Sequence, residues 1–141
     1  MHSSKKEKEY NMKYWSDALS TGMDDVDEQH KVLVGLLEKI TDCKEGDEAD
    51  VNAILIELVN YTSYHFSYEE KKMEASAYPK MADHKKEHTD LLNAVPGYLT
   101  DFQAGKLTAA DLVAFLKKWV VNHIMVKDIL WGNYEKSVAG K

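Results

Sequence analysis

The sequence predicts an all-α fold, an antiparallel up-down-up-down four-helix bundle preceded by an extended N-terminal arm. The 141 residues include only two prolines and seven glycines, so long stretches lack helix-breaking residues. Apolar residues recur at helical spacing in four segments, and no segment alternates apolar and polar residues as a half-buried strand does. A chain of this length builds one core, so we expect an arm at 1–20, one domain at 21–135 and a tail at 136–141.

The first part of the chain predicts the arm and then a long helix. We expect the first ten residues to be mobile, and Tyr14 with Trp15 to lie across the bundle as an extended lead-in. From Asp24 onward the apolar residues share one helix face, and Gly46 offers a left-handed end to this helix. The apolar positions are Val26, Val32, Leu33, Leu36, Leu37 and Ile40.

The second helix begins within residues 47–50 and stops at Tyr78-Pro79, because proline disfavours helical geometry in the residue before it. The third helix extends from about Lys80 to Ala104. We expect a kink at Pro96-Gly97, where the helix loses a hydrogen bond and the proline ring clashes with the preceding turn.

The fourth helix begins at Thr108, which forms a candidate capping box with Asp111 three residues later. Its apolar face continues to Ile129, and we expect it to close near Gly132. The connections between the four helices are short, so neighbouring helices must be antiparallel.

Composition excludes several classes of function. The formal net charge of −6, from 24 acidic and 18 basic side chains, comes without a basic stripe, so nucleic acid is not an expected partner. Eighteen consecutive apolar residues occur nowhere and the start resembles no signal peptide, so we expect no membrane association and a cytoplasmic location. The single cysteine, Cys43, cannot form an internal disulfide. We expect a monomer.

Histidine is placed on every predicted helix. Apart from His2 in the arm, the histidines are His30, His65, His84, His88 and His123. His84 and His88 are four residues apart and share a helix face, as do His65 and Glu69. Asp128 follows His123 by five residues, which in a regular helix turns it partly away and about 7.5 Å along the axis. We therefore expect that Asp128 need not serve the same edge of a metal site.

Each histidine alone fits an ordinary hydrogen-bonded residue on a helix face, and Glu70 beside Glu69 fits a solvated surface. Five imidazoles beside carboxylates in an apolar setting indicate a metal, because such groups are costly to bury unless paired or metal-bound. The donor set is too large for one tetrahedral zinc ion and too rich in nitrogen for calcium or magnesium. It favours two transition-metal ions bridged by carboxylates, iron ahead of manganese.

Two other motifs are disfavoured. The segment from His84 to His88 matches the H-x-x-E-H pattern of inverted zinc proteases, in which the glutamate acts as a base. That interpretation leaves His30, His65 and His123 unexplained, and we interpret Glu87 as a surface charge instead. Ferritin-like carboxylate bundles use an E-x-x-H spacing, which this sequence lacks.

Four motifs together resemble the hemerythrin family, most closely its bacterial members, over nearly the whole chain. They are Asp27-Glu-Gln-His30, His65-Phe-Ser-Tyr-Glu69-Glu70, His84-Lys-Lys-Glu-His88 and His123-Ile-Met-Val-Lys-Asp128. The resemblance implies that His84, His88 and His123 hold one iron and that His30 and His65 hold the other. It implies that Glu69, Asp128 and an oxo or hydroxo group bridge the two iron ions, and that the two-histidine iron keeps an open position where dioxygen binds reversibly.

Five apolar residues near these ligands in sequence are expected to wall the oxygen pocket: Phe66, Met73, Trp119, Val120 and Ile124. All five would serve core packing at the same time. The family often has leucine at the position of Val120, and the smaller side chain is expected to admit more solvent and to speed autoxidation.

The leading hypothesis is therefore an oxygen carrier, store or scavenger rather than an enzyme. One alternative is an oxygen or redox sensor module of a larger signalling protein, in which the charged arm would be part of a linker. A further alternative is a di-iron enzyme acting on peroxide or nitric oxide, which turnover of either substrate would reveal.

Overall fold

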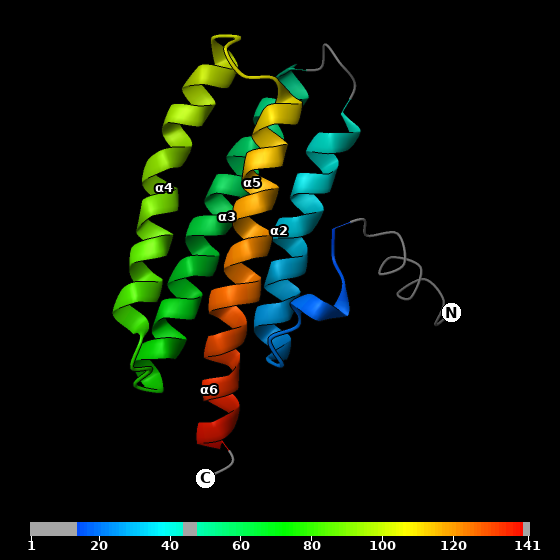
Figure 1. The fold of residues 1–141 in the computed structure, drawn as a ribbon. Helices are drawn as coiled ribbons and strands as arrows, with labels where there is room; N and C mark the ends of the chain where they lie inside the picture. The colour runs from blue at the N-terminus through cyan, green and yellow to red at the C-terminus, as the bar shows by residue number, and fades with distance from the viewer. Residues whose placement is uncertain (1–13, 44–47, 140–141) are drawn as a thin grey trace, which may run out of the picture.

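The computed structural model of the protein describes residues 14–43 and 48–139. Within these residues, the short helix η1 (Asp17–Leu19) is followed by α2 (Asp24–Asp42), α3 (Glu48–Ala75), α4 (Met81–Gln103) and α5 (Ala109–His123). The π-helix η2 (Ile124–Asp128) then joins α5 to α6 (Ile129–Ala139) without a break. The predicted fold class is confirmed: Figure 1 shows α2, α3, α4 and the α5–η2–α6 rod standing side by side.

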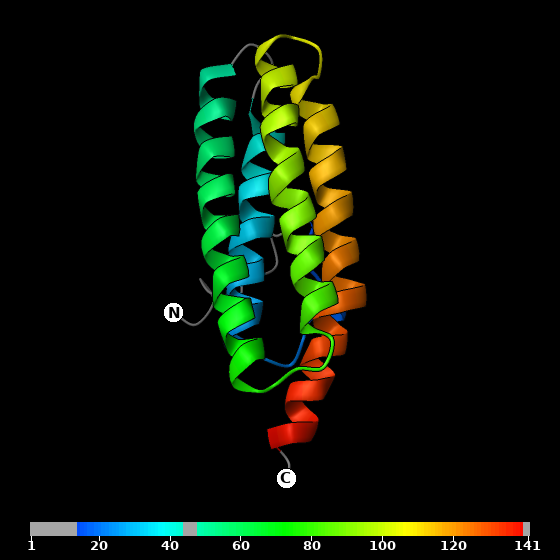
Figure 2. The same cartoon turned by 90° about the vertical axis from the view of Figure 1, so that its left-hand side faces the viewer.

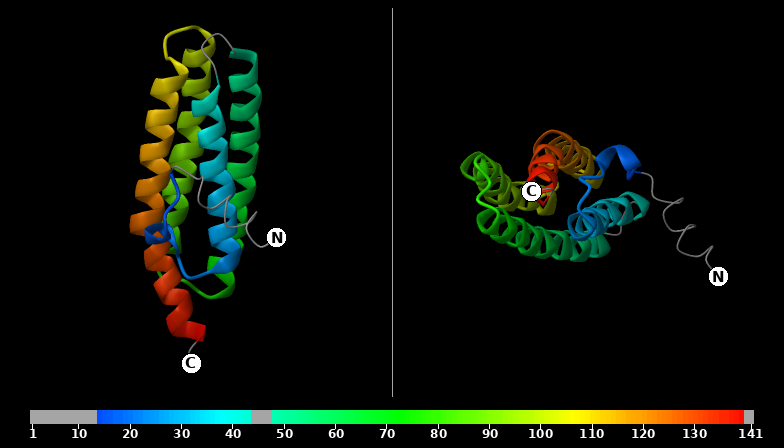
Figure 3. Two further views of the ribbon diagram at one scale, coloured as in Figure 1. Left: turned by 90° about the vertical axis from the view of Figure 1, so that its right-hand side faces the viewer. Right: turned by 90° about the horizontal axis from the view of Figure 1, so that it is seen from below.

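The helices form a ring of four. Helix α2 packs against α3 and α5, and α4 packs against α3 and, less extensively, against α5. Figure 3 shows this arrangement from below the bundle. None of the described helices combines the length and the apolar character needed to cross a membrane.

The helix ends agree with the sequence in part. The capping box at the start of α5 is present, since the Thr108 side chain accepts from the Asp111 amide and the Asp111 carboxylate accepts from the Thr108 amide. Helix α3 ends at Ala75 ahead of Pro79, with Ala77 in the left-handed region at φ 56°. The expected end at Gly46, the mobility of the first ten residues and part of the tail lie outside the described residues.

The sequence predicted a kink in the third helix at Pro96-Gly97 and an end of the fourth helix near Gly132. Helix α4 runs unbroken through Pro96, so the proline does not end it, and a kink there stays a prediction. The prediction that the last helix closes near Gly132 is wrong, because α6 continues to Ala139 (Figure 2). A Cβ at Gly132 would lie 2.3 Å from the Thr21 carbonyl oxygen, so this glycine lets the lead-in approach the helix.

The lead-in contacts both α2 and α5, which agrees with the prediction that Tyr14 lies across the bundle. The Tyr14 amide donates to Glu38 on α2 at 3.0 Å, and Lys117 on α5 lies 4.1 Å from the centre of the Tyr14 ring. Farther along, the Asp27 carboxylate accepts from the Ser20 hydroxyl, the Thr21 hydroxyl and the Thr21 amide at 2.7 to 2.8 Å. These bonds fix the first turn of α2, directly before His30.

Two apolar clusters fill the bundle. The larger cluster includes Leu37, Leu55, Phe102 and Leu112 and fills the end where α2 connects to α3 and α4 connects to α5. We call this the apolar end. The smaller cluster, at the opposite end, consists of Met23, Val26, Met73, Tyr78 and Trp131. Buried histidines and carboxylates lie between the two clusters, so apolar side chains enclose them from both ends.

Candidate metal centre

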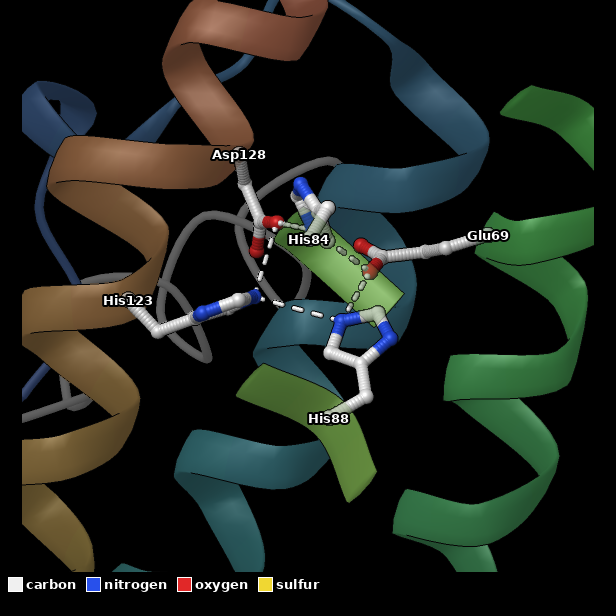
Figure 4. Close-up of side chains that lie close together, drawn as sticks. All are labelled: Glu69, His84, His88, His123 and Asp128. Atoms are coloured by element: carbon white, nitrogen blue, oxygen red, sulfur yellow. Dashed lines mark hydrogen bonds and ion pairs between the residues drawn. The ribbon is translucent and has the colours of Figure 1, made fainter. Parts of the chain in front are cut away.

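Seven buried polar side chains meet in the layer between the two apolar clusters, and they are the seven that the sequence singled out as ligands. Possible ligand atoms of Glu69, His84, His88, His123 and Asp128 lie within 4.8 Å of one another (Figure 4), and those of His30, His65 and Glu69 do the same. We call His84, His88 and His123 the three-histidine set, and His30 with His65 the two-histidine set. All seven are at most 5% exposed.

Regular helical spacing places four of these residues. His65 and Glu69 are one turn apart on α3, with His65 Nε2 3.0 Å from Glu69 Oε2. His84 and His88 are one turn apart on α4, with ring centroids 4.7 Å apart. Each pair therefore projects from one face of its helix towards the centre of the bundle.

The π-helix η2 brings Asp128 to the same side of the rod as His123. In an α-helix the five-residue spacing would turn the aspartate away, but a π-helix pairs residues i and i+5. His123 Nε2 and Asp128 Oδ1 consequently lie 3.2 Å apart. The expectation that Asp128 need not serve the same edge as His123 was wrong, because it assumed a regular helix.

Each of the two carboxylates spans both histidine sets. Glu69 directs Oε2 towards His30 and His65, at 3.1 and 3.0 Å, and Oε1 towards His88 at 3.2 Å. Asp128 directs Oδ2 towards His30 at 3.0 Å and Oδ1 towards His84 at 2.8 Å. One oxygen of each carboxylate thus belongs to each set.

The outer nitrogens of three histidines are held by hydrogen bonds. His88 Nδ1 donates to Glu70 at 2.9 Å, His123 Nδ1 donates to Glu87 at 2.8 Å, and His65 Nδ1 donates to Gln29 at 2.7 Å. Sequence reasoning missed all three partners, and its interpretation of Glu87 as a surface charge and Glu70 as part of a solvated face was wrong. Glu87 precedes His88 by one residue, but its partner His123 is 36 positions away, so no local spacing signalled the contact.

These hydrogen bonds at Nδ1 determine which ring nitrogen carries the lone pair in each neutral histidine. A neutral imidazole whose Nδ1 carries the proton keeps a lone pair on Nε2. The Nε2 atoms of His88 and His123 face each other at 3.2 Å, and with both Nδ1 protons committed to carboxylates neither neutral ring can donate to the other. Two electron pairs therefore converge on one place, which is the arrangement that a cation stabilises.

Several buried atoms of the cluster have no hydrogen-bond partner within the described part of the chain. They are Glu69 Oε1, His84 Nε2 and both carboxylate oxygens of Asp128, with His30 Nδ1 on the outer side. His84 Nε2 and Asp128 Oδ1 are only 2.8 Å apart, yet they lack hydrogen-bond geometry. Neighbouring ligands of an octahedral ion with bonds of about 2.1 Å lie about 3 Å apart, so this spacing fits a shared metal ion.

Charge compensation dominates the metal-free cluster. Burial opposes protonation of His30, but Asp128 and Glu69 outweigh it and raise the pKa of His30 to about 10. The same carboxylates raise the pKa of His84 to about 9 against the effect of burial. Burial favours the neutral acid at Glu69 and Asp128, yet the imidazoles hold the pKa of both carboxyls well below the usual range. A bound cation would replace these protons as the compensating charge.

Aromatic rings and a small cavity adjoin the cluster. The Phe66 ring stacks on His88 with centroids 3.7 Å apart, and Trp119 stacks on His123 at 4.6 Å. A cavity of about 20 Å³ beside the ligands is lined by Phe66, Trp119, Val120 and Ile124 among others. Met73, the fifth residue expected there, does not line it and packs in the smaller apolar cluster.

The donor set fits a pair of iron ions. Five imidazoles, two carboxylates and no thiol make up the two groups found among the described residues, and imidazole with carboxylate suits iron. A single ion could not use all seven side chains, since even an octahedral ion accepts six donors.

Comparisons with known proteins agree with this geometry. Residues 21–131, which include all seven side chains, match the family described as Hemerythrin HHE cation binding domain. The chain is 37% identical over 115 residues to a bacteriohemerythrin of Pseudomonas aeruginosa (strain LESB58), covering 81% of this chain and 75% of the relative. A bacteriohemerythrin of Stenotrophomonas maltophilia (strain R551-3) is 33% identical over 124 residues, or 87% of this chain and 81% of the relative. A crystal structure of wild-type hemerythrin matches with a TM-score of 0.78 and 31% identity, covering 84% of this chain and 94% of that chain.

Proposed function

The chain belongs to the hemerythrin family, and we propose that it binds dioxygen reversibly at a pair of iron ions held by the seven buried side chains. The observation that carries this proposal is the division of the cluster into two histidine sets that share both carboxylates. A di-iron pair, when bound, supplies the two electrons that dioxygen takes up on binding and returns on release.

The ligands divide unequally between the two ions. We propose that His84, His88 and His123 hold one ion, that His30 and His65 hold the other, and that Glu69, Asp128 and an oxo or hydroxo group bridge them. The two carboxylates support this division, because each carboxylate directs one oxygen atom to each histidine set. The two-histidine set is one protein ligand short, which leaves a position for a small external ligand.

The walls of the adjoining cavity suit a ligand that must leave unchanged. Phe66, Trp119, Val120 and Ile124 give the cavity an apolar wall, and an apolar wall limits access of water to a bound ligand. The greater solvent access expected from the small Val120 side chain stays a prediction. Asp128 is the one acid of the lining, and its lowered pKa keeps it ionised. The Thr62 hydroxyl, also in the lining, donates to the Leu58 carbonyl at 2.7 Å, so its proton is engaged. Among the described residues that line the cavity, neither a neutral carboxylic acid nor the Thr62 hydroxyl is thus available to protonate a bound ligand.

No observation on the described residues favours the sensor or the enzyme alternative, and both stay predictions from the sequence. Cytoplasmic location and a monomeric state have the same standing.

Anaerobic reconstitution with ferrous iron tests the proposal. We expect two irons per chain and a colour that appears under oxygen and disappears when oxygen is removed, over repeated cycles. His123→Ala should abolish the colour and remove one iron, whereas His2→Ala, at a histidine that belongs to none of the four sequence motifs, should change neither. A chain with His65, His84 and His123 all replaced by alanine that still retained two irons would contradict the assignment.

A further inference from the structure

The outer nitrogens of the two histidine sets differ in the charge that they face. In the three-histidine set, His88 and His123 each donate to a carboxylate, Glu70 at 2.9 Å and Glu87 at 2.8 Å. In the two-histidine set, His65 donates to the neutral amide of Gln29 at 2.7 Å. His30 Nδ1 is buried and makes no hydrogen bond among the described residues.

This difference changes how strongly each imidazole donates electrons from its inner nitrogen. A carboxylate that accepts the Nδ1 proton draws it outward, which raises electron density at Nε2 and makes the ring a more basic ligand. A neutral amide does this less, because a hydrogen bond to a charged acceptor is roughly twice as strong as one between neutral groups. His30 Nδ1 has no acceptor among the described residues, so no outer hydrogen bond increases the electron density at its Nε2.

The two carboxylates are not equivalent either. The Glu70 side chain is 21% exposed, whereas that of Glu87 is 36% exposed and pairs with Lys127 at 3.2 Å. Solvent and the lysine both offset the charge of Glu87, so Glu70 should act more strongly on its histidine. Gln29 is 9% exposed, and a charge placed there would be poorly screened.

We propose that these outer partners, Glu70 and Glu87 on one side and Gln29 on the other, set the order of metal affinity of the two positions in the cluster. The three-histidine set takes its ion first and holds it tightly, and Gln29 keeps the two-histidine set a weak donor that fills second. This inference rests on the proposed function only in assuming that metal binds at the cluster.

The number of histidines alone would also rank the two positions, so the test must change the outer partners and leave the ligands intact. Glu70→Gln and Glu87→Gln keep a hydrogen-bond acceptor and remove the charge. Gln29→Glu keeps the acceptor and adds a charge. Asp90→Asn, at an exposed residue of α4 paired with Lys86, removes the same charge away from any imidazole, and Gln103→Glu adds one at the apolar end.

Titration of the metal-free chain with cobalt(II) measures the ranking directly. Cobalt(II) shifts the NMR signals of nearby imidazole N–H protons, so each of the two binding steps can be assigned to His88 and His123 or to His65. We expect Glu70→Gln to weaken the first step by about 10- to 100-fold and Glu87→Gln to weaken it less. Gln29→Glu should strengthen the second step by about tenfold, a gain that damage to the fold would not produce.

Two outcomes would overturn the proposal. One is an affinity for the first cobalt ion in Glu70→Gln and Glu87→Gln that equals the affinity in Asp90→Asn. The other is an affinity for the second cobalt ion in Gln29→Glu that equals the affinity in Gln103→Glu. Because the cobalt titration involves no oxygen, it separates this proposal from the oxygen-binding function: a chain could rank cobalt as expected and still fail the reversible colour test.

Discussion

The apolar end and the ligand layer join the same four helices by different interactions. At the apolar end, Leu37, Leu55 and Leu112 are at most 2% exposed and pack in one apolar cluster. In the ligand layer, five imidazoles and two carboxylates occupy the equivalent positions. Apolar groups gain about 25 cal/mol for each Å² removed from water, whereas buried charges cost free energy unless they are compensated. We therefore expect the apolar end to fold without metal, and the ligand layer to gain stability when a cation binds there.

Removal of the metal should produce the largest difference between the two regions. A ligand at 1,000 times its Kd stabilises the folded state by about 4 kcal/mol, so a chelator should lower the free energy of unfolding by at least that amount. Hydrogen exchange should show faster exchange of the amides near His65, His84 and His123, while those near Leu55 and Leu112 stay protected. Re-adding the metal should restore protection, and equal loss in both regions would contradict the comparison.

Truncation at the apolar end should have the next largest effect. Leu55→Ala removes a side chain that is 1% exposed and should lower the free energy of unfolding by about 2 to 5 kcal/mol, measured by urea denaturation. Ile56→Ala, at the neighbouring residue of α3, removes a side chain that is 53% exposed and should change it by about 0.5 kcal/mol or less. Both variants should bind two irons. A fall in iron content in Leu55→Ala would mean that the two regions are not separable.

The pH dependence of the metal-free chain should come from the ligand layer. The raised pKa values of His30 and His84, about 10 and about 9, stabilise the fold fully below the ordinary histidine value of 6.5, and this contribution is lost as pH rises through 9 to 10. The lowered pKa values of Glu69 and Asp128 stabilise it above their ordinary values near 4, a contribution lost as pH falls. The metal-free chain should therefore be most stable at about pH 5 to 6.

Urea denaturation at pH 6 and pH 9 measures this effect, and we expect a loss on the order of 2 kcal/mol at the higher pH. The metal-loaded chain should respond in the opposite sense and lose stability on acidification, because protons compete with the metal for the imidazoles. In Leu55→Ala the free energy of unfolding should change with pH by the same amount, because the substituted residue lies outside the ligand layer. A metal-free chain that gained stability between pH 6 and pH 9 would contradict the charge arrangement of the cluster.

The two regions also differ in how well the sequence predicted them. The helices were recognisable because apolar spacing and the Thr108 capping box are local signals. The five histidines and Glu69 were recognisable because histidine on every helix, with Glu69 one turn after His65, is chemically unusual. For these residues the residue type and its spacing carried the information, whereas Asp128 entered the ligand set only through the resemblance to the hemerythrin family.

The remaining features depend on contacts between residues distant in sequence. The π-helix that turns Asp128 inward is a choice between two hydrogen-bond patterns that spacing does not reveal. The presence of glycine at position 132 is explained by the close approach of Thr21, and the role of Glu87 depends on its contact with His123. Met73 follows Glu69 by one turn, but its side chain packs below the ligand layer, which a position in the sequence could not distinguish from the pocket wall.

The cap at the start of α5 offers the smallest and most local test of the apolar end. Thr108→Ala leaves the Asp111 amide without its side-chain acceptor and should lower the free energy of unfolding by about 1 kcal/mol. Thr108→Ser keeps the acceptor oxygen and should leave the value nearly unchanged, which separates the lost cap from any other effect of substitution. Because the cap lies about four turns of helix before His123, both variants should bind two irons and keep the reversible colour. A loss of iron in Thr108→Ala alone would show that the start of α5 positions the ligands, and the proposed independence of the two regions would then be wrong.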